Sequence, residues 1–238
     1  MSDLSGQTVV LIGGSAGIGL ETARLARAEG ADVILTGRNA SRLKEAGEEI
    51  GAVRTEAFDA ADFAQLTEFF DSLPTVDHVL VTAGGPYYGP LAEFDFEAAK
   101  RSIDQLMWLQ IRLAQLSVDK VRPGGTLLFM GGTGARRPKP GLFFASAMTA
   151  SSPALVAGLA LEITPVRVNL IAAGFVDTPL SATLLGDKLE DRREELRSTL
   201  PIRRVVGPAD VAALAVHLMV NTALTGATYD IDGGQQLL

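Results

Sequence analysis

Apolar runs with the composition of β-strands alternate with helical patterns from one end of the chain to the other. The strand-like runs are Thr8–Ile12, Asp32–Thr36, Val53–Phe58, His78–Thr82, Thr126–Met130, Val166–Ile171 and Ala227–Ile231. The helical patterns between them are Gly17–Glu29, Ser41–Ile50, Asp62–Ser72, Phe96–Val121, Ala145–Ile163 and Pro208–Val220. Several strands are continuously apolar, as in a parallel sheet covered by helices on both faces. The alternation therefore predicts an α/β fold with a doubly wound, seven-stranded parallel sheet.

No internal repeat, low-complexity tract or linker interrupts this alternation, so residues 1–238 are expected to form a single domain. The segment Asp187–Arg197 departs from the pattern because it is dense in charged residues. It is predicted to be a helical excursion over one end of the sheet.

Composition narrows the class of protein. The chain is 47% hydrophobic and 21% charged, which is ordinary for a folded globular protein. Its net charge of −7 argues against nucleic acid or an anionic membrane as the main partner. It has no cysteine, which excludes disulfides and thiol catalysis and fits a cytoplasmic location; we expect no metal site. The first residues, Met1–Gly6, lack the basic-then-apolar pattern of a signal peptide.

One uncharged stretch, Pro140–Leu161, is long enough to cross a bilayer. Its polar residues and the internal Pro153 dilute its apolar character. A helix buried on all sides, either in the core or at a subunit interface, is the favoured interpretation.

A glycine-rich segment follows the first predicted strand and opens the first predicted helix, with glycines at Gly13, Gly17 and Gly19. The first allows a tight turn, the second a close approach to a phosphate, and the third close packing of helix on strand. Free N–H groups and the helix dipole would face the anion. A purely structural loop is the alternative, but this position in the chain favours a dinucleotide site.

The end of the second strand selects between the two nicotinamide dinucleotides. NAD sites usually place an acidic residue there for the ribose hydroxyls, whereas this strand ends in Arg38, and Asp32 lies at its other end. Arg38 can form a forked contact with a 2′-phosphate, or it is a solvated surface residue. Asp59, after the third strand, either accepts from the adenine amino group or caps a helix.

Five motifs together resemble the short-chain dehydrogenase/reductase family along essentially the whole chain. They are Gly13–Gly19, Thr82–Gly85, Arg167–Asn169, Gly174–Thr178 and Asp232–Gly234. The resemblance implies a Rossmann-like fold, a nicotinamide dinucleotide and assembly into homodimers or homotetramers. The residues expected to contact NADP(H) are Gly13, Ser15, Ala16, Gly17, Ile18, Gly19, Arg38, Asp59, Ala83, Gly84, Val176 and Thr178.

The chain departs from the family at its catalytic residues. Family members carry a Tyr-x-x-x-Lys pair on the fifth long helix, a serine at the end of the fifth strand and an asparagine on the fourth helix. Aligned from the fifth strand, these positions are occupied by Leu106, Gly131, Phe144 and Met148. Aligned from downstream residues, the pair falls on Ala145 and Thr149, and Gly132 is an alternative serine position. The usual acid–base residues are absent in both alignments.

The histidines and tyrosines are the remaining candidates for a proton donor. His78 and His217 are expected to be structural. Tyr87 and Tyr88 follow the fourth strand at the ligand-binding end of the sheet, as apolar lining of a substrate pocket or, for Tyr88, as a candidate donor. The basic segment Arg136–Lys139 either holds an acidic substrate or is only solvated.

The leading hypothesis is a divergent NADP(H)-dependent oxidoreductase that acts on a carbonyl or alcohol group of an unidentified small molecule through a non-standard active site. A catalytically silent NADP(H)-binding sensor or partner subunit is the main alternative. A non-redox reaction on the same scaffold is a third.

Overall fold

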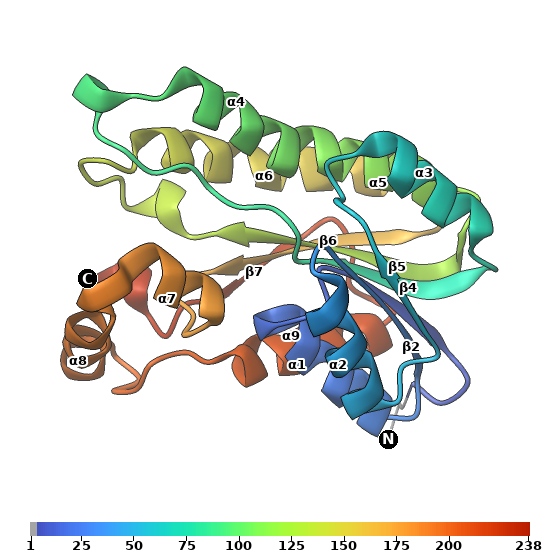
Figure 1. Ribbon diagram of the computed structural model, residues 1–238. Coiled ribbons are helices and arrows are strands. Elements are labelled where there is room, and N and C mark those ends of the chain that lie inside the picture. The colour runs from blue at the N-terminus through green and yellow to red at the C-terminus, as the bar shows by residue number, and fades with distance from the viewer. Residues whose placement is uncertain (1–3) are drawn as a thin grey trace.

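The computed structural model describes residues 4–238 and places all seven strands in one parallel sheet (Figure 1). The strands are β1 (Thr8–Ile12), β2 (Asp32–Gly37), β3 (Arg54–Ala57), β4 (Val76–Val81), β5 (Val121–Gly132), β6 (Arg167–Ala173) and β7 (Thr228–Ile231). The α-helices are α1 (Gly17–Ala28), α2 (Ala40–Ile50), α3 (Phe63–Ser72), α4 (Phe96–Ile103), α5 (Leu109–Ser117), α6 (Phe143–Glu162), α7 (Pro179–Leu185), α8 (Leu189–Thr199) and α9 (Pro208–Val220). Short 3-10 turns are η1 (Leu91–Glu93), η3 (Gly134–Arg136), η4 (Gly186–Lys188) and η5 (Gln235–Leu237), and η2 (Asp104–Trp108) is a π-helical turn. The predicted doubly wound α/β fold is confirmed.

Both faces of the sheet are buried, because successive side chains of a strand point to opposite faces. Val10 and Ile12 of β1 pack with α3, α5 and α6, while Val9 and Leu11 pack with α1, α2 and α9. Figure 1 shows these helices as two layers with the sheet edge-on between them. The continuously apolar strands of the sequence are the consequence of this two-sided burial.

The strand order β3-β2-β1-β4-β5-β6-β7 reverses direction between β1 and β4. Connections from these two central strands leave to opposite faces, which opens a crevice beyond their carboxyl ends. The glycine-rich segment after β1 and the segment after β4 both begin there. The topology therefore places the candidate site at this end of the sheet.

The predicted single helix Phe96–Val121 is wrong in two respects. It is divided by the π-turn η2, and it ends at Ser117 because the amide of Lys120 turns back to the carbonyl of Ser117. Val121 is instead the first residue of β5 and pairs with Val76 of β4. The apolar spacing continued the helical pattern to Val121, but strand pairing takes that residue into the sheet.

The segments around the candidate site also differ from expectation. The charge-rich segment is helical, as α8, with ion pairs such as Arg193 to Asp177 and Arg197 to Glu190. The preceding helix α7 was not expected. It begins with a capping box in which Thr178 and Ser181 exchange hydrogen bonds, followed by Pro179 in its first turn. In Figure 1, α7 and α8 lie beyond the end of the sheet, as the excursion predicted for this segment requires.

Helix α6 is buried on one side only, so burial on all sides within the chain is wrong. It packs on β5 and β6 through residues that include Ala145 and Val156, while Leu161 on the other side is 80% exposed. By length and composition it is the one helix among residues 4–238 that could cross a membrane. Its packing on the sheet is that of a covering helix, and its outer face remains without a partner in the monomer.

At the opposite end of the sheet, buried His78 belongs to a chain of hydrogen bonds. Arg167 donates from Nη2 to Thr126 Oγ1 (2.9 Å), and Thr126 lies 2.8 Å from His78 Nδ1. His78 Nε2 lies 2.6 Å from Gln7 Oε1. Since arginine can only donate, Thr126 is free to donate to Nδ1, and the neutral ring then donates from Nε2 to Gln7. His78 is a structural group, as expected.

Burial lowers the pKa of His78 to about 4; nearby Arg167 lowers it too, and Asp77 opposes the shift. The folded pKa is below the value of about 6.5 expected for the unfolded chain, so the unfolded state binds the proton more tightly. Stability conferred by neutral His78 is complete above pH 6.5 and is lost as the pH falls toward 4. The loss amounts to about 3 kcal/mol in the free energy of unfolding.

We expect His78→Asn to remove this acid-dependent loss, because asparagine does not titrate. Urea unfolding at several pH values between 7 and 4 measures it. The variant is less stable at pH 7, but its free energy of unfolding should fall about 3 kcal/mol less than that of the wild type. His217, the other histidine, is exposed. Parallel pH curves for the two proteins would contradict the assignment.

Candidate functional site

The glycine-rich segment after β1 packs directly against the segment after β4. A Cβ on Gly13 would lie 2.7 Å from Thr82 Oγ1 and 2.8 Å from the amide nitrogen of Ala83. A Cβ on Gly19 would lie 2.3 Å from the carbonyl oxygen of Gly13. Thr82 Oγ1 also donates a hydrogen bond to that oxygen (2.8 Å). Only glycine fits at these two positions, so the two segments form a fixed floor for the crevice.

The first turn of α1 opens onto this floor. The residue before the helix is Ala16, whose side chain cannot cap the free backbone N–H groups. These groups and the positive end of the helix dipole suit the diphosphate of a dinucleotide. Ser15 lies beside the end of β2, where a Cβ on Gly37 would be 3.1 Å from its Oγ. Ser15, Ala16, Gly17, Ile18 and Gly19 thus occupy one continuous turn.

At the end of β2, Arg38 is exposed and has no ion pair or side-chain hydrogen bond within residues 4–238. The nearest acid on this strand, Asp32, lies at its other end and faces Arg27 across 3.6 Å. Asp59 is exposed after β3 and accepts a hydrogen bond from the amide of Ala61 (3.0 Å). Asp62, rather than Asp59, caps α3. Arg38 and Asp59 are therefore both accessible on the β2–β3 side of the crevice.

The opposite side of the crevice is formed by the segment between β6 and α7. Val176 is buried and pairs with Val206. Thr178 reaches the glycine-rich segment, because a Cβ on Gly17 would lie 3.5 Å from the Thr178 Cβ. Gly84, after β4, has a φ of +110°, and a Cβ there would lie 2.7 Å from the carbonyl oxygen of Gln105 in η2. The structure thus places the predicted cofactor residues at the carboxyl end of the sheet, with Arg38 and Asp59 after β2 and β3 and with Val176 and Thr178 after β6.

The degenerate catalytic positions lie where β5 ends and α6 begins. A Cβ on Gly132 would lie 3.2 Å from the Thr149 methyl, and Ala145 is buried on the same side of α6. Phe144 instead joins a cluster of aromatic rings. Ala145 and Thr149, the pair given by one alignment, therefore lie on the side of α6 that faces the sheet. Phe144 and Met148, the pair given by the other alignment, do not. Leu106 lies in the π-turn η2, directly after Gln105, which packs against Gly84.

Aromatic rings from two distant segments meet at the start of α6, and sequence reasoning missed this cluster. Its members are Tyr87, Phe94 and Phe96 from the segment after β4, and Phe143 and Phe144 from α6. The Tyr87 and Phe144 ring centroids are 6.0 Å apart. The Tyr87 hydroxyl accepts a hydrogen bond from the amide of Asp95 (2.8 Å), which fixes it as a structural group. Only the frequency of aromatic residues in both segments hints at the cluster.

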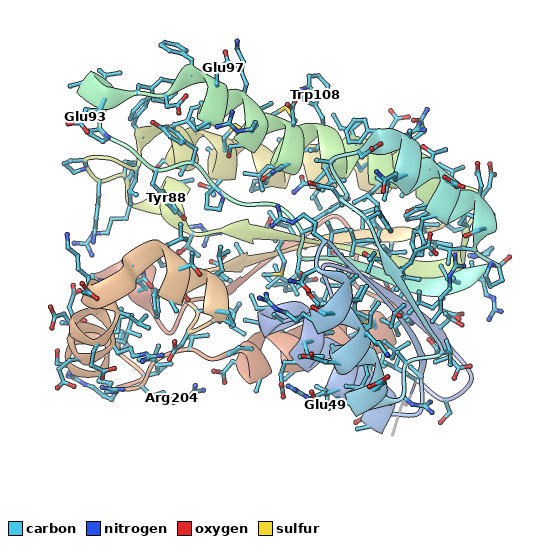
Figure 2. The ribbon with its side chains drawn as sticks, viewed as in Figure 1. Glu49, Tyr88, Glu93, Glu97, Trp108 and Arg204 are labelled. Carbon is cyan, nitrogen blue, oxygen red and sulfur yellow. The ribbon has the colours of Figure 1, made fainter. Side chains whose placement is uncertain are left out.

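Tyr88 differs from its neighbour Tyr87. Its side chain is 48% exposed, and its hydroxyl has no hydrogen-bond partner in the part of the chain that the structure describes. In Figure 2 it lies between the helical layer that contains α4 and the helix α7. Partial burial raises the pKa of Tyr88, so the phenol stays protonated at neutral pH. Nothing in the structure lowers its pKa toward that of an efficient acid.

Comparison with known proteins gives a consistent match. The family model described as Enoyl-(Acyl carrier protein) reductase matches residues 13–236. The short-chain dehydrogenase/reductase malC of Malbranchea aurantiaca is 27% identical over 253 residues, covering 98% of this chain and 96% of that protein. Human dehydrogenase/reductase SDR family member 4 is 26% identical over 246 residues, with coverage of 97% and 88%.

Solved structures agree with the sequence matches. The structure of MalC Reductase/Diels-Alderase superposes with a TM-score of 0.90 at 26% identity, covering 99% of this chain and 98% of that one. A small-chain dehydrogenase in complex with NADPH gives 0.85 at 25% identity, with coverage of 98% and 99%. A short chain dehydrogenase/reductase family protein gives 0.87 at 30% identity, covering both chains completely. The chain belongs to the short-chain dehydrogenase/reductase family.

Proposed function

We propose that residues 1–238 form one NADP(H)-binding domain and that the protein is a divergent oxidoreductase acting on a carbonyl or alcohol group. The observation that carries the choice of cofactor is Arg38, an exposed and unpaired cation at the end of β2, where NAD sites usually have an acid. The relative solved with NADPH supports this choice. NADPH, when bound, supplies a hydride to the substrate.

Each residue of the crevice has a part in binding. The N–H groups from Gly13 to Gly19 hold the diphosphate, and Arg38, beside Ser15, forms a fork on the 2′-phosphate. Asp59 has a carboxylate oxygen free to accept from the adenine amino group. At the other end of the crevice, Ala83, Gly84, Val176 and Thr178 hold the nicotinamide half. These contacts use backbone groups and small side chains that are all present.

The proton side of the reaction lacks its usual groups. Ala145 and Thr149 replace the tyrosine and lysine that face the sheet, so no residue there lowers a phenol pKa or holds the nicotinamide ribose. Loss of a positioned general acid costs about 10²–10⁴-fold in rate. We propose the hydroxyl of Tyr88 as the proton donor for the remaining activity. This hydroxyl has no hydrogen-bond partner within residues 4–238, and it lies on the same side of the sheet as the start of α6.

Two alternatives use the same cofactor site. A catalytically silent NADP(H)-binding sensor or partner subunit is favoured by the loss of the pair. A non-redox reaction is favoured by the likeness to MalC, whose solved structure is described as Reductase/Diels-Alderase. Substrate turnover with consumption of NADPH separates the oxidoreductase from both.

The preference between the two cofactors can be tested. NADPH should bind at least about tenfold more tightly than NADH, because a forked charge-assisted contact to the 2′-phosphate is available only with NADPH. Arg38→Asp should reverse this order by placing a carboxylate where it repels the phosphate and accepts from ribose hydroxyls. Fluorescence titration of both reduced cofactors measures the ratio.

Lys44→Asp is the matched control, because it makes the same change of charge at an exposed position further along α2. It should leave the ratio of the two affinities unchanged. Equal affinities of the wild-type protein for NADPH and NADH would show that Arg38 does not select the cofactor.

The rate of carbonyl reduction can also be tested. Purified protein with NADPH should reduce a panel of ketones and aldehydes well below the ~1 s⁻¹ lower end of typical enzyme turnover. Tyr88→Phe should abolish the residual rate without changing NADPH affinity, since the phenol contacts the substrate and not the cofactor. Because the pKa of Tyr88 is raised, the rate should show no loss up to about pH 9. Tyr87→Phe is the control, because the Tyr87 hydroxyl already accepts a hydrogen bond from the amide of Asp95 within the same segment.

Turnover at ordinary rates would show that another catalytic group exists. NADPH binding with no turnover across the panel would favour the silent sensor.

Assembly of several copies into an oligomer is common in this family, and it can be tested for this protein. The outer face of α6 carries a stripe of exposed small residues that includes Ala150, Ala154 and Ala157, and Trp108 projects from the same helical layer (Figure 2). Small residues allow close approach of a second helix, and we propose a homodimer or homotetramer formed through α5 and α6. Light scattering should give a mass two or four times 25.0 kDa.

Ala154→Glu should shift the protein toward the monomer by burying a carboxylate in the contact. Ala64→Glu, at an exposed position on α3, should leave the mass unchanged. A wild-type mass of 25.0 kDa at micromolar concentration would rule out this interface.

A further inference from the structure

A hollow of about 160 Å³ lies between the segment after β5, helix α8 and the last turn of the chain. Arg137 and Lys139 come from the first segment, and Arg192, Glu195 and Thr199 come from α8. Figure 1 shows α8 and the C-terminus close together at this side of the molecule. Three cations from two separate segments therefore line one small space.

These cations are not all neutralised. Arg192 Nη1 lies 2.6 Å from Glu195 Oε2, and its guanidinium lies over the ring of Phe175, 5.9 Å from the centroid. Arg137 and Lys139 are exposed, and their side chains make no ion pair or hydrogen bond within residues 4–238. Among the described residues that line the hollow, Glu195 supplies an acidic side chain and Leu238 carries the carboxylate of the last residue, so three cations face two acidic groups. The space thus carries an excess of positive charge in a chain whose net charge is −7.

The neighbouring arginines show that pairing is the rule in this region. Arg136 contacts Asp230 and donates to Gln236 (2.8 Å). Arg193 forms a fork on Asp177, with distances of 2.9 and 2.8 Å. Arg137 and Lys139, by contrast, have no such partner among residues 4–238, and both line the hollow from the segment after β5.

Two contacts join the hollow to the candidate site. Phe175, beneath Arg192, directly precedes Val176, a proposed nicotinamide contact. On the other side, the carbonyl of Gly141, two residues beyond the basic segment, accepts a hydrogen bond from the amide of Gly89, next to Tyr88 (3.0 Å). The hollow therefore lies next to two segments that carry residues of the candidate site.

From these observations we infer that the hollow binds an oxyanion, either a carboxylate or a phosphate monoester, carried by a small molecule. Arg137 and Lys139 bind it, and Arg192 is held in place by Phe175 and Glu195 to complete the site. This inference deepens the proposed function, since an acidic group on the substrate itself would be held here. The volume of the hollow, about 160 Å³, suffices for such a group with bound water, because one water occupies about 30 Å³ in the liquid. Arginine and lysine supply the charge-assisted hydrogen bonds that oxyanions require.

Inorganic phosphate is the probe for the test. The protein, saturated with NADPH so that the cofactor phosphate sites are filled, is titrated with phosphate while its melting temperature is followed. Potassium chloride at equal ionic strength is the reference. We expect a saturable rise in melting temperature for the wild type and at least tenfold weaker apparent affinity for the double variant Arg137→Ala/Lys139→Ala.

The double variant Arg101→Ala/Lys44→Ala removes the same two charges from exposed positions elsewhere and should titrate like the wild type. A wild type without saturable phosphate binding would overturn the inference, and so would equal affinity in Arg137→Ala/Lys139→Ala. The same titrations without cofactor remain informative if NADPH fails to bind, because the variants report on the hollow and not on the glycine-rich segment. Failure of the proposed function is therefore distinguishable from failure of this inference.

Competition identifies the source of the oxyanion. Carbonyl compounds with and without a carboxylate are added to the phosphate-bound protein. Displacement of phosphate by the acidic members alone assigns the oxyanion to the substrate. Phosphate binding that no member of the panel affects assigns it to a separate anionic ligand at the rim.

Discussion

The contact of two glycines with the segment after β4 is the constraint on which the candidate site depends. Gly13 and Gly19 leave no room for a Cβ between the backbone of the first loop and Thr82. This contact holds the start of α1 against the end of β4, at the point where the strand order reverses. A larger side chain would have to separate the two strands or lift the helix, and the free N–H groups of α1 would no longer face the crevice.

The fold could be predicted from the sequence because its main signal is local. Strands buried on both faces are apolar at every position, and the helices between them have a period of 3.6 residues. The π-turn η2 could not be predicted in this way, because the apolar spacing of a helix continues through it; in the structure Gln105 of this turn lies against Gly84 after β4. The end of α5 was also missed, since Val121 suits a helix by its spacing and is taken into the sheet by pairing with Val76.

The residues of the candidate site likewise differ in whether the sequence alone can predict them. Arg38 and the glycines could be proposed from the sequence because each follows directly after a predicted strand. The absence of the tyrosine and lysine pair could also be recognised from the sequence, since only three tyrosines occur in the chain and none lies on α6. Which of the two alignments faces the sheet needed the contact between Gly132 and Thr149. The charge excess at Arg137 and Lys139 needed knowledge of which cations find partners, and sequence shows only that basic residues cluster.

The aromatic cluster lies next to the positions that the tyrosine and lysine of the family would occupy. A tyrosine and a lysine at the start of α6 would need solvent or polar partners, because burying an unpaired charge is costly. With Ala145 and Thr149 in their places, the neighbouring ring of Phe144 can pack on Tyr87 and Phe94 without a charged group beside it. Apolar rings cannot stabilise negative charge that develops on a substrate oxygen, so the remaining polar contacts come from backbone groups and from the cations at the rim. On the proposed function and the inferred oxyanion site, the substrate would be recognised by its shape and by a distant acidic group, and the proton would come from a hydroxyl whose pKa is not lowered.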